Sequence, residues 1–159
     1  MKYANTPDDL LPIEKMLEVS GLELLQDIAE GRIAQPPIGK SLNFSLQEAT
    51  DGSVRFRGAP LFEHTNPMGT THGGWYGTIM DSCLACAVTT KIPVGSTSTT
   101  LEFKVNILRP IPLGMEVDAI GIADHVGRTT GVAHGTIRGV QDGKIYATGS
   151  TTCTVIKMA

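Results

Sequence analysis

Charged residues are scarce in this chain of 159 residues. Asp, Glu, Lys and Arg make up 18% of it, compared with roughly 25% in an average globular protein. Apolar residues reach 41%, which excludes a disordered chain, because disorder needs low hydrophobicity and high net charge. At −3, the net charge lacks the basic excess of nucleic-acid and membrane-surface binders. We therefore expect one domain with no nucleic-acid or membrane partner, and a subunit interface would account for the uncharged surface.

Two further features that the sequence lacks bear on the cellular compartment of the protein. No segment approaches the ~20 apolar residues of a membrane span, and residues 1–16 lack the apolar centre of a secretory signal. Cysteine is rare and odd in number, at three residues, which is typical of reduced thiols. Cys83 and Cys86 form a CxxC inside an apolar segment, and no second cysteine pair could complete a zinc site. We expect a cytoplasmic protein without a metal, in which these two cysteines are packing residues.

Apolar periodicity predicts the elements of the fold. Mixed helical spacings indicate two short helices within residues 8–29, and 35–37 ends this helical region. Alternation predicts a hairpin over 42–56. The nearly chargeless segment 75–90 predicts a helix, and because it is apolar all round we expect protein on every side of it. Four strands should follow as an antiparallel meander, at 98–108, 115–123, 129–140 and 144–156. This order predicts an α+β domain whose antiparallel sheet wraps around one long central helix.

One residue of that helix does not fit its surroundings. Asp81 is the only Asp, Glu, Lys or Arg between Glu63 and Lys91. A carboxylate among apolar side chains loses hydration, which costs several kcal/mol if it stays unpaired. Two interpretations are open at this point: an Asp satisfied by backbone donors or a neighbouring hydroxyl, and a functional carboxylate.

The segment before the helix favours the second interpretation. His72, Gly73 and Gly74 lead into the helix, where free backbone N–H groups carry partial positive charge and suit an oxyanion or a polarised carbonyl. The two glycines let a ligand approach the backbone closely. Asn66 and His72 add two polar groups to the same loop. Together with Asp81, this cluster predicts a site for attack on a carbonyl.

The order of these residues along the chain is specific. It reads Asn66-x2-Gly69-x2-His72-Gly73-Gly74-x6-Asp81, then Thr100-Leu101-Glu102-Phe103-x5-Arg109-Pro110, then Gly127-Arg128. This pattern resembles the hotdog-fold acyl-CoA thioesterases over residues 42–156, in particular the PaaI-like branch related to 4-hydroxybenzoyl-CoA thioesterases. The resemblance implies a hotdog domain at 41–159 with an N-terminal helical extension at 1–40 packed on it. It also implies homodimers that often pair into tetramers.

The resemblance assigns catalytic roles to several residues. Asp81 would be the nucleophile or the general base. The amide of Gly73 would donate to the thioester carbonyl as the oxyanion hole, while Asn66 and His72 would position substrate or water. A hydroxyl near the start of the next long strand would assist the water.

That hydroxyl belongs to Thr100, or to Thr99 if the register shifts by one. In this family the loop of one subunit meets the carboxylate of the other, so we expect a monomer to be inactive.

Residues that would contact the acyl-coenzyme A substrate follow from the same resemblance. They are Gly74, Trp75, Arg109, Gly127 and Arg128. Trp75 would shape the acyl pocket. Arg109, Lys104 and Arg128 could meet the phosphates of coenzyme A, or be ordinary solvated basic residues, with the Gly127-Arg128 turn as the best candidate.

Three functions remain open from the sequence. The expected one is hydrolysis of an acyl-CoA thioester to a free acid and coenzyme A, without a metal or an organic cofactor. A hotdog-fold dehydratase or hydratase is the first alternative, and it would pair a His with a carboxylate to move protons beside the carbonyl. A non-catalytic acyl-CoA-binding module is the second. The acyl group is not predicted.

Overall fold

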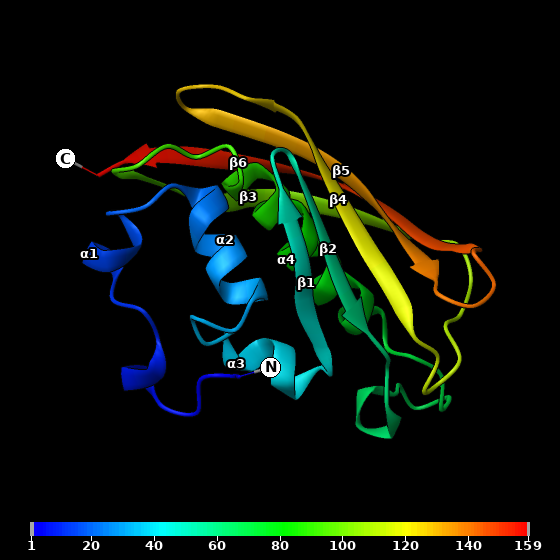
Figure 1. Cartoon of the computed structure of the whole chain (residues 1–159). Coiled ribbons are helices and arrows are strands. Elements are labelled where there is room, and N and C mark those ends of the chain that lie inside the picture. Colours follow the sequence, from blue (N-terminus) through cyan, green and yellow to red (C-terminus); the bar gives the residue numbers. More distant parts are fainter. Residues whose placement is uncertain (1, 159) are drawn as a thin grey trace.

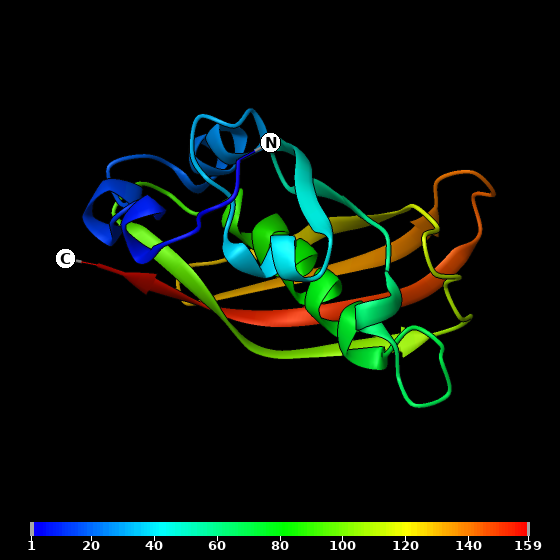
Figure 2. The same ribbon diagram turned by 90° about the horizontal axis from the view of Figure 1, so that it is seen from below.

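An antiparallel sheet that curves around one long helix makes up most of the molecule (Figure 1). The computed structural model describes residues 2–158. The strands are β1 (Phe44–Thr50), β2 (Ser53–Gly58), β3 (Ser96–Ile107), β4 (Val117–Val126), β5 (Thr130–Gly139) and β6 (Ile145–Lys157). The helices are α1 (Ile13–Met16), α2 (Gly21–Ala29), α3 (Pro37–Ser41) and α4 (Gly73–Thr89), with two short 3-10 helices, η1 (Pro7–Asp9) and η2 (Phe62–His64). The predicted α+β class and the sheet wrapped around a central helix are confirmed, and Figure 2 shows α4 crossing one face of the sheet.

The strand order is β1-β2-β4-β5-β6-β3, and every neighbouring pair is antiparallel. The predicted meander of the last four strands was therefore wrong for β3, which lies at the sheet edge beside β6 while β4 pairs with β2. The cause is the connection 108–116, which is too long for a tight hairpin turn. Ile111, in its middle, is held by Thr71 and Tyr76 near the start of α4. The connection therefore runs away from β3, and the chain returns to the sheet as β4, beside β2.

Helix α4 packs closely on the sheet because several strand positions are glycine. An added Cβ at Gly121 would lie 2.6 Å from the backbone oxygen of Cys83, and one at Gly149 would lie 2.8 Å from Met80 Cγ. Residues of α4 on the sheet side are fully buried: Trp75, Tyr76, Ile79, Met80, Cys83, Leu84, Ala87 and Val88. The opposite face of α4 is only half-buried in one chain. Our expectation of protein on every side of this helix was wrong for a single subunit.

The N-terminal helices cover the remaining edge of this core. Ser20 and Glu23 form a capping box at the start of α2, in which Ser20 N donates to Glu23 Oε2 at 3.0 Å. Gly21 lets α2 approach the end of α4, because an added Cβ would lie 1.9 Å from Thr89 O. Helix α3 was missed, since we expected the helical region to end at 35–37 and Pro37 instead occupies its first turn. Within residues 2–158, no helix is long and apolar enough to cross a membrane.

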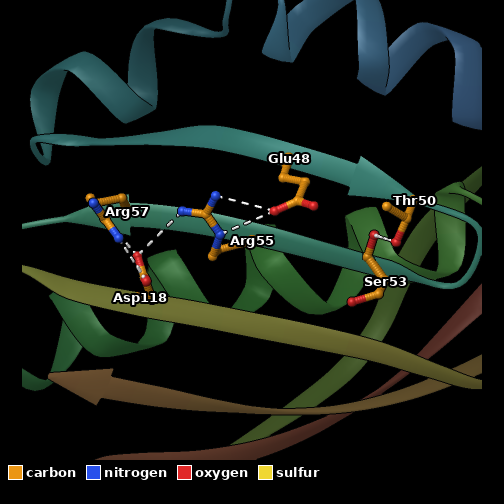
Figure 3. A network of polar contacts seen from close by, with 6 residues as sticks. All are labelled: Glu48, Thr50, Ser53, Arg55, Arg57 and Asp118. Carbon is orange, nitrogen blue, oxygen red and sulfur yellow. Dashed lines mark hydrogen bonds and ion pairs between the residues drawn. The ribbon is translucent and has the colours of Figure 1, made fainter. Parts of the chain in front are cut away.

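The outer face of the sheet carries an ion-pair network over β1, β2 and β4 (Figure 3). Arg57 binds Asp118 through two parallel bonds of 2.8 and 2.9 Å, and Arg55 Nη2 lies 3.1 Å from Glu48 Oε2. These side chains alternate along β2 with Val54 and Phe56, which enter the core. The network therefore lies on the face away from α4, and it takes no part in the site described below.

Candidate active site

Asp81 lies beside the edge strand β3, and one hydroxyl group of this strand donates a hydrogen bond to it. Thr100 Oγ1 donates to Asp81 Oδ1 at 3.0 Å, and both residues are half-buried. Thr99, the alternative from the sequence, is exposed and precedes Thr100 on a strand whose side chains alternate between two faces. The ladder between β3 and β6 shifts register between Thr100 and Glu102, next to this contact. The second carboxylate oxygen, Oδ2, has no hydrogen-bond donor among residues 2–158.

Asp81 belongs to a seam along which α4 and β3 face each other. Gly73, Gly77 and Asp81 are four residues apart, so they share one face of the helix. An added Cβ at Gly73 would lie 3.6 Å from Ile107 Cδ1, and one at Gly77 would lie 3.6 Å from Phe103 Cε2. The eight residues from Gly73 to Asp81 correspond to about 12 Å along the helix axis. One thioester carbonyl therefore cannot contact the Gly73 amide and the Asp81 carboxylate of the same chain.

The first turn of α4 leaves one amide free at the surface. His72 is the N-cap residue, and its Nδ1 accepts from Gly74 N at 2.8 Å. Trp75 N donates to His72 O at 3.0 Å. Within the described part of the chain, Gly73 N has no hydrogen-bond acceptor, and Gly73 is exposed. The free donor therefore lies where the helix dipole is positive, and His72 leaves it available by binding its neighbour.

Asn66 organises the loop in front of this turn. Its Oδ1 accepts from Met68 N at 2.9 Å and from Thr70 N at 3.2 Å, and its Nδ2 donates to Thr70 Oγ1 at 2.8 Å. Asn66, Gly73 and Arg109 line one open depression of about 350 Å³. The structure thus brings three of the sequence-predicted site residues to the N-terminal end of α4, apart from Asp81 and Thr100.

Tyr76 also lines this depression, and the sequence analysis missed it. Its hydroxyl accepts from Ile111 N at 2.7 Å and donates to Arg109 O at 3.2 Å. Tyr76 thus fixes the backbone that carries Arg109, whose guanidinium donates to Ile145 O. The one phenol in this largely apolar helix was the signal available in the sequence, because a buried Tyr hydroxyl normally finds a partner.

Trp75 and Gly74 lie on different sides of the same turn. Trp75 is 2% exposed, and its Nε1 donates to Leu42 O at 2.8 Å. Its ring packs edge-on against Tyr76 at 6.0 Å between centroids. The Trp75 side chain is therefore anchored in the core, whereas Gly74 is exposed.

The remaining basic candidates lie elsewhere. Gly127 and Arg128 form the turn between β4 and β5, at the end of the sheet far from the start of α4 (Figure 1). Thr129 O accepts from Val155 N there, near the C-terminal end of β6. Lys104 is exposed on β3 and pairs with Ser150. Within one chain, the structure does not bring Arg128 near Arg109.

The cysteines near Asp81 are neutral thiols. Burial, together with the charge of Asp81 and the nearby Cys153, raises the pKa of Cys86 to about 12. Burial also raises the pKa of Cys83 well above its ordinary value. Thiolates are the reactive form of cysteine, so these two residues are suited to packing. Within residues 2–158, no group of three or more His, Cys, Asp and Glu side chains could hold a metal ion.

Comparisons with known proteins bear on the family and the fold of this chain. The family model of the thioesterase superfamily matches residues 68–146. A Halobacterium salinarum protein named "putative esterase" is 33% identical over 97 residues, which is 58% of this chain and 63% of that protein. The matched region therefore spans less than two thirds of this relative.

Solved structures show the same fold. The PaaI protein of E. coli is 20% identical, with a TM-score of 0.74 over 86% of this chain and 96% of that one. A phenylacetic acid degradation-related protein of Ralstonia eutropha JMP134 is 25% identical, with a TM-score of 0.73 over 82% of this chain and 98% of that one. The hotdog fold implied by the sequence is confirmed, and this chain belongs to the thioesterase superfamily.

Proposed function

We propose that the protein hydrolyses the thioester bond of an acyl-coenzyme A, releasing the free acid and coenzyme A. One observation carries this proposal: the seam between α4 and β3 presents a carboxylate oriented by a hydroxyl and, on the same helix face, a free amide at the helix N-terminus. These are the two groups that acyl transfer to water needs, an activator of the nucleophile and a donor for the oxyanion.

The amide of Gly73 would polarise the carbonyl. In the transition state the carbonyl oxygen gains negative charge, which the N–H and the positive end of the α4 dipole stabilise. Glycine at this position leaves the surface open to the substrate, since only Ile107 lies within 4 Å of an added Cβ.

Asp81 would drive the attack by one of two balanced routes. As a general base it takes a proton from water, the hydroxide adds to the carbonyl carbon, the C–S bond breaks, and the proton passes to the departing thiolate. As a nucleophile it forms an acyl-aspartyl anhydride and expels the thiolate, and water then cleaves the anhydride. Either route consumes one water and uses no cofactor. In both, Thr100 is the positioning residue that holds Oδ1 while Oδ2 reacts.

The separation along α4 supports a site shared by two subunits. Because Gly73 and Asp81 of one chain are about 12 Å apart, the amide of one subunit would act with the carboxylate of the other. Strand β3 is an edge strand with exposed Leu101, Phe103 and Ile107, which favours pairing with a second copy. A two-fold axis across β3 reverses the partner strand, and this would bring the Asp81 region of one chain toward the partner subunit's Gly73.

Such pairing would also bring basic residues from the two chains closer together. Arg109 lies near the Ile107 end of β3, and the turn at Arg128 lies at the opposite end of the sheet. Reversal of the partner places Arg109 of one chain at the same end of the assembly as the partner subunit's Arg128. We propose these arginines as contacts for the phosphates of coenzyme A.

The hydratase alternative finds less support, because it needs a His beside the carboxylate. Within one chain His72 precedes Asp81 by nine residues, and in a shared site its Nδ1 would still be occupied as the acceptor of Gly74 N, so only one ring nitrogen could move a proton.

Thiol release from acyl-coenzyme A tests the proposal, with substitutions that remove each group separately. Asp81→Asn should lower kcat by orders of magnitude without loss of fold. Gly73→Pro removes the N–H at a helix position that tolerates proline, and His72 has φ −65° and ψ 140°, which suits a residue before proline. We expect a fall in kcat of about 10²- to 10³-fold, the cost of one oxyanion donor.

Gly73→Ala is the matched control, because it adds a methyl group but keeps the N–H. It should lose far less activity than Gly73→Pro. Near-normal hydrolysis by Asp81→Asn, or equal losses in the two Gly73 variants, would contradict the mechanism.

A further inference from the structure

An apolar cavity lies behind Asp81, separate from the depression at Gly73. Its volume is about 170 Å³, and it is bounded by α4, by the inner face of β1 and β2, and by the N-terminal extension. Half of its wall comes from that extension: Leu25, Ile28, Gln35, Pro36, Ile38 and Gly39. The cavity therefore exists only because α2 and α3 close over the end of the sheet.

The wall presents no charge and little free hydrogen-bonding capacity. Gln35 is 3% exposed, and its amide is occupied by the backbone of Leu46, accepting from N at 2.9 Å and donating to O at 3.2 Å. The Cys86 thiol stays protonated, because burial raises its pKa to about 12. Most of the other wall residues are aliphatic or aromatic, so an apolar group is the ligand that this cavity would take.

The α4 side of the cavity is adjacent to the reactive carboxylate. Ser82, Ala85 and Cys86 line it, and Ser82 directly follows Asp81. Ala85 is four residues after Asp81, so their Cβ atoms are neighbours on the helix, about 5–6 Å apart. The carbonyl of a thioester bound at Asp81 would thus lie within one helical turn of the cavity.

We propose that this cavity holds the acyl group of the thioester, so that the N-terminal extension selects the substrate; this inference rests on the hydrolysis proposed above. An apolar cavity of about 150 Å³ holds one benzene molecule. The size here therefore fits one phenyl ring or an aliphatic chain of about six carbons. Ala85 and Ile38 set the limit from opposite sides, one on α4 and one on α3.

The test is a chain-length profile of thiol release, using acetyl-, butyryl-, hexanoyl-, octanoyl-, decanoyl- and phenylacetyl-coenzyme A. Each methylene that enters the cavity should raise kcat/KM about fourfold, so hexanoyl should exceed acetyl by on the order of 10²-fold. Ala85→Leu fills the cavity and should bring the hexanoyl-to-acetyl ratio close to one.

Ile38→Ala enlarges the cavity and should move the optimum toward octanoyl, a gain that misfolding cannot produce. Ile13→Ala is its matched control: Ile13 is 43% exposed, against 45% for Ile38, and it does not line the cavity. This control should leave the profile unchanged.

Binding of S-methyl- and S-hexyl-coenzyme A, thioethers that cannot be hydrolysed, separates this inference from the proposed function. Tighter binding of the hexyl compound that Ala85→Leu abolishes would support the cavity even if no thioester is cleaved. If thiol release occurs but neither Ala85→Leu nor Ile38→Ala changes its chain-length profile, the cavity assignment is overturned, whereas the proposed hydrolase activity is not.

Discussion

Thr100 Oγ1 lies 3.0 Å from Asp81 Oδ1, and it is the one side-chain donor to this carboxylate within residues 2–158. A hydrogen bond to a charged group is typically worth about 1.5–3 kcal/mol, more than one between neutral groups. It also fixes which oxygen of Asp81 remains open. The edge strand thus orients the carboxylate through a single contact.

Removing that contact should lower turnover without removing the carboxylate. We expect Thr100→Val to reduce kcat about ten- to a hundredfold, in line with the loss of one charged hydrogen bond. KM should change little, because Thr100 acts through Asp81. Thr100→Ser should restore most of the rate, and Thr99→Val, on the exposed face of the same strand, is the matched control. A change in KM alone would contradict a positioning role.

Two inactive variants should complement each other if the site is shared. In a mixed dimer of Asp81→Asn and Gly73→Pro chains, one site combines two intact groups and the other combines two defects. Random assembly should then restore about a quarter of the wild-type rate. The measurement is thiol release after joint refolding or co-expression, with each variant alone as the control. Mixtures no faster than the single variants would show that each chain carries its own site.

His72 should behave as a helix cap. His72→Ala removes the acceptor for Gly74 N and should lower the free energy of unfolding by about 0.5–2 kcal/mol. His72→Asn should recover part of this loss, since Asn is a good N-cap residue. Thermal melts of the three proteins provide the comparison. A large fall in kcat with an unchanged Tm would instead show that His72 acts on the substrate.

Gly121 should not tolerate a side chain. Gly121→Ala places a methyl group 2.6 Å from the backbone oxygen of Cys83, so either α4 or β4 must move. Overpacking of this kind costs about 1–3 kcal/mol, measurable by urea denaturation. Gly73→Ala is the control for stability, because its added Cβ meets only Ile107, at 3.6 Å. Equal stability of the two variants would contradict the close approach.

The sequence predicted the central helix well because its apolar length and lack of charge allow few other structures. The structure begins α4 at Gly73, two residues earlier than expected, since the cap residue His72 was not recognised as a helix boundary. The edge position of β3 could not be predicted, because it depends on where Tyr76 and Thr71 anchor Ile111. Local periodicity contains no information about such a long connection.

The candidate site, like the fold, could be predicted from the sequence only in part. Asp81 stood out as a lone charge, and the choice between Thr100 and Thr99 needed only the alternation of β3 once its register was known. The cavity had no sequence signal at all. Its wall combines Leu25, Ile38 and Phe44 with Ala85, residues that become neighbours only when the extension folds over α4.

This last arrangement has an evolutionary consequence. The groups proposed for bond cleavage, Gly73, Asp81 and Thr100, all lie within the segment 68–146 that matches the superfamily. The cavity wall from Leu25 to Gly39 lies before that segment. Under the proposed assignment, mutations in this part of the wall would change the acyl group that is selected and leave the three proposed cleavage groups in place, so a duplicated copy of this gene could acquire a new substrate by changing its first forty residues alone.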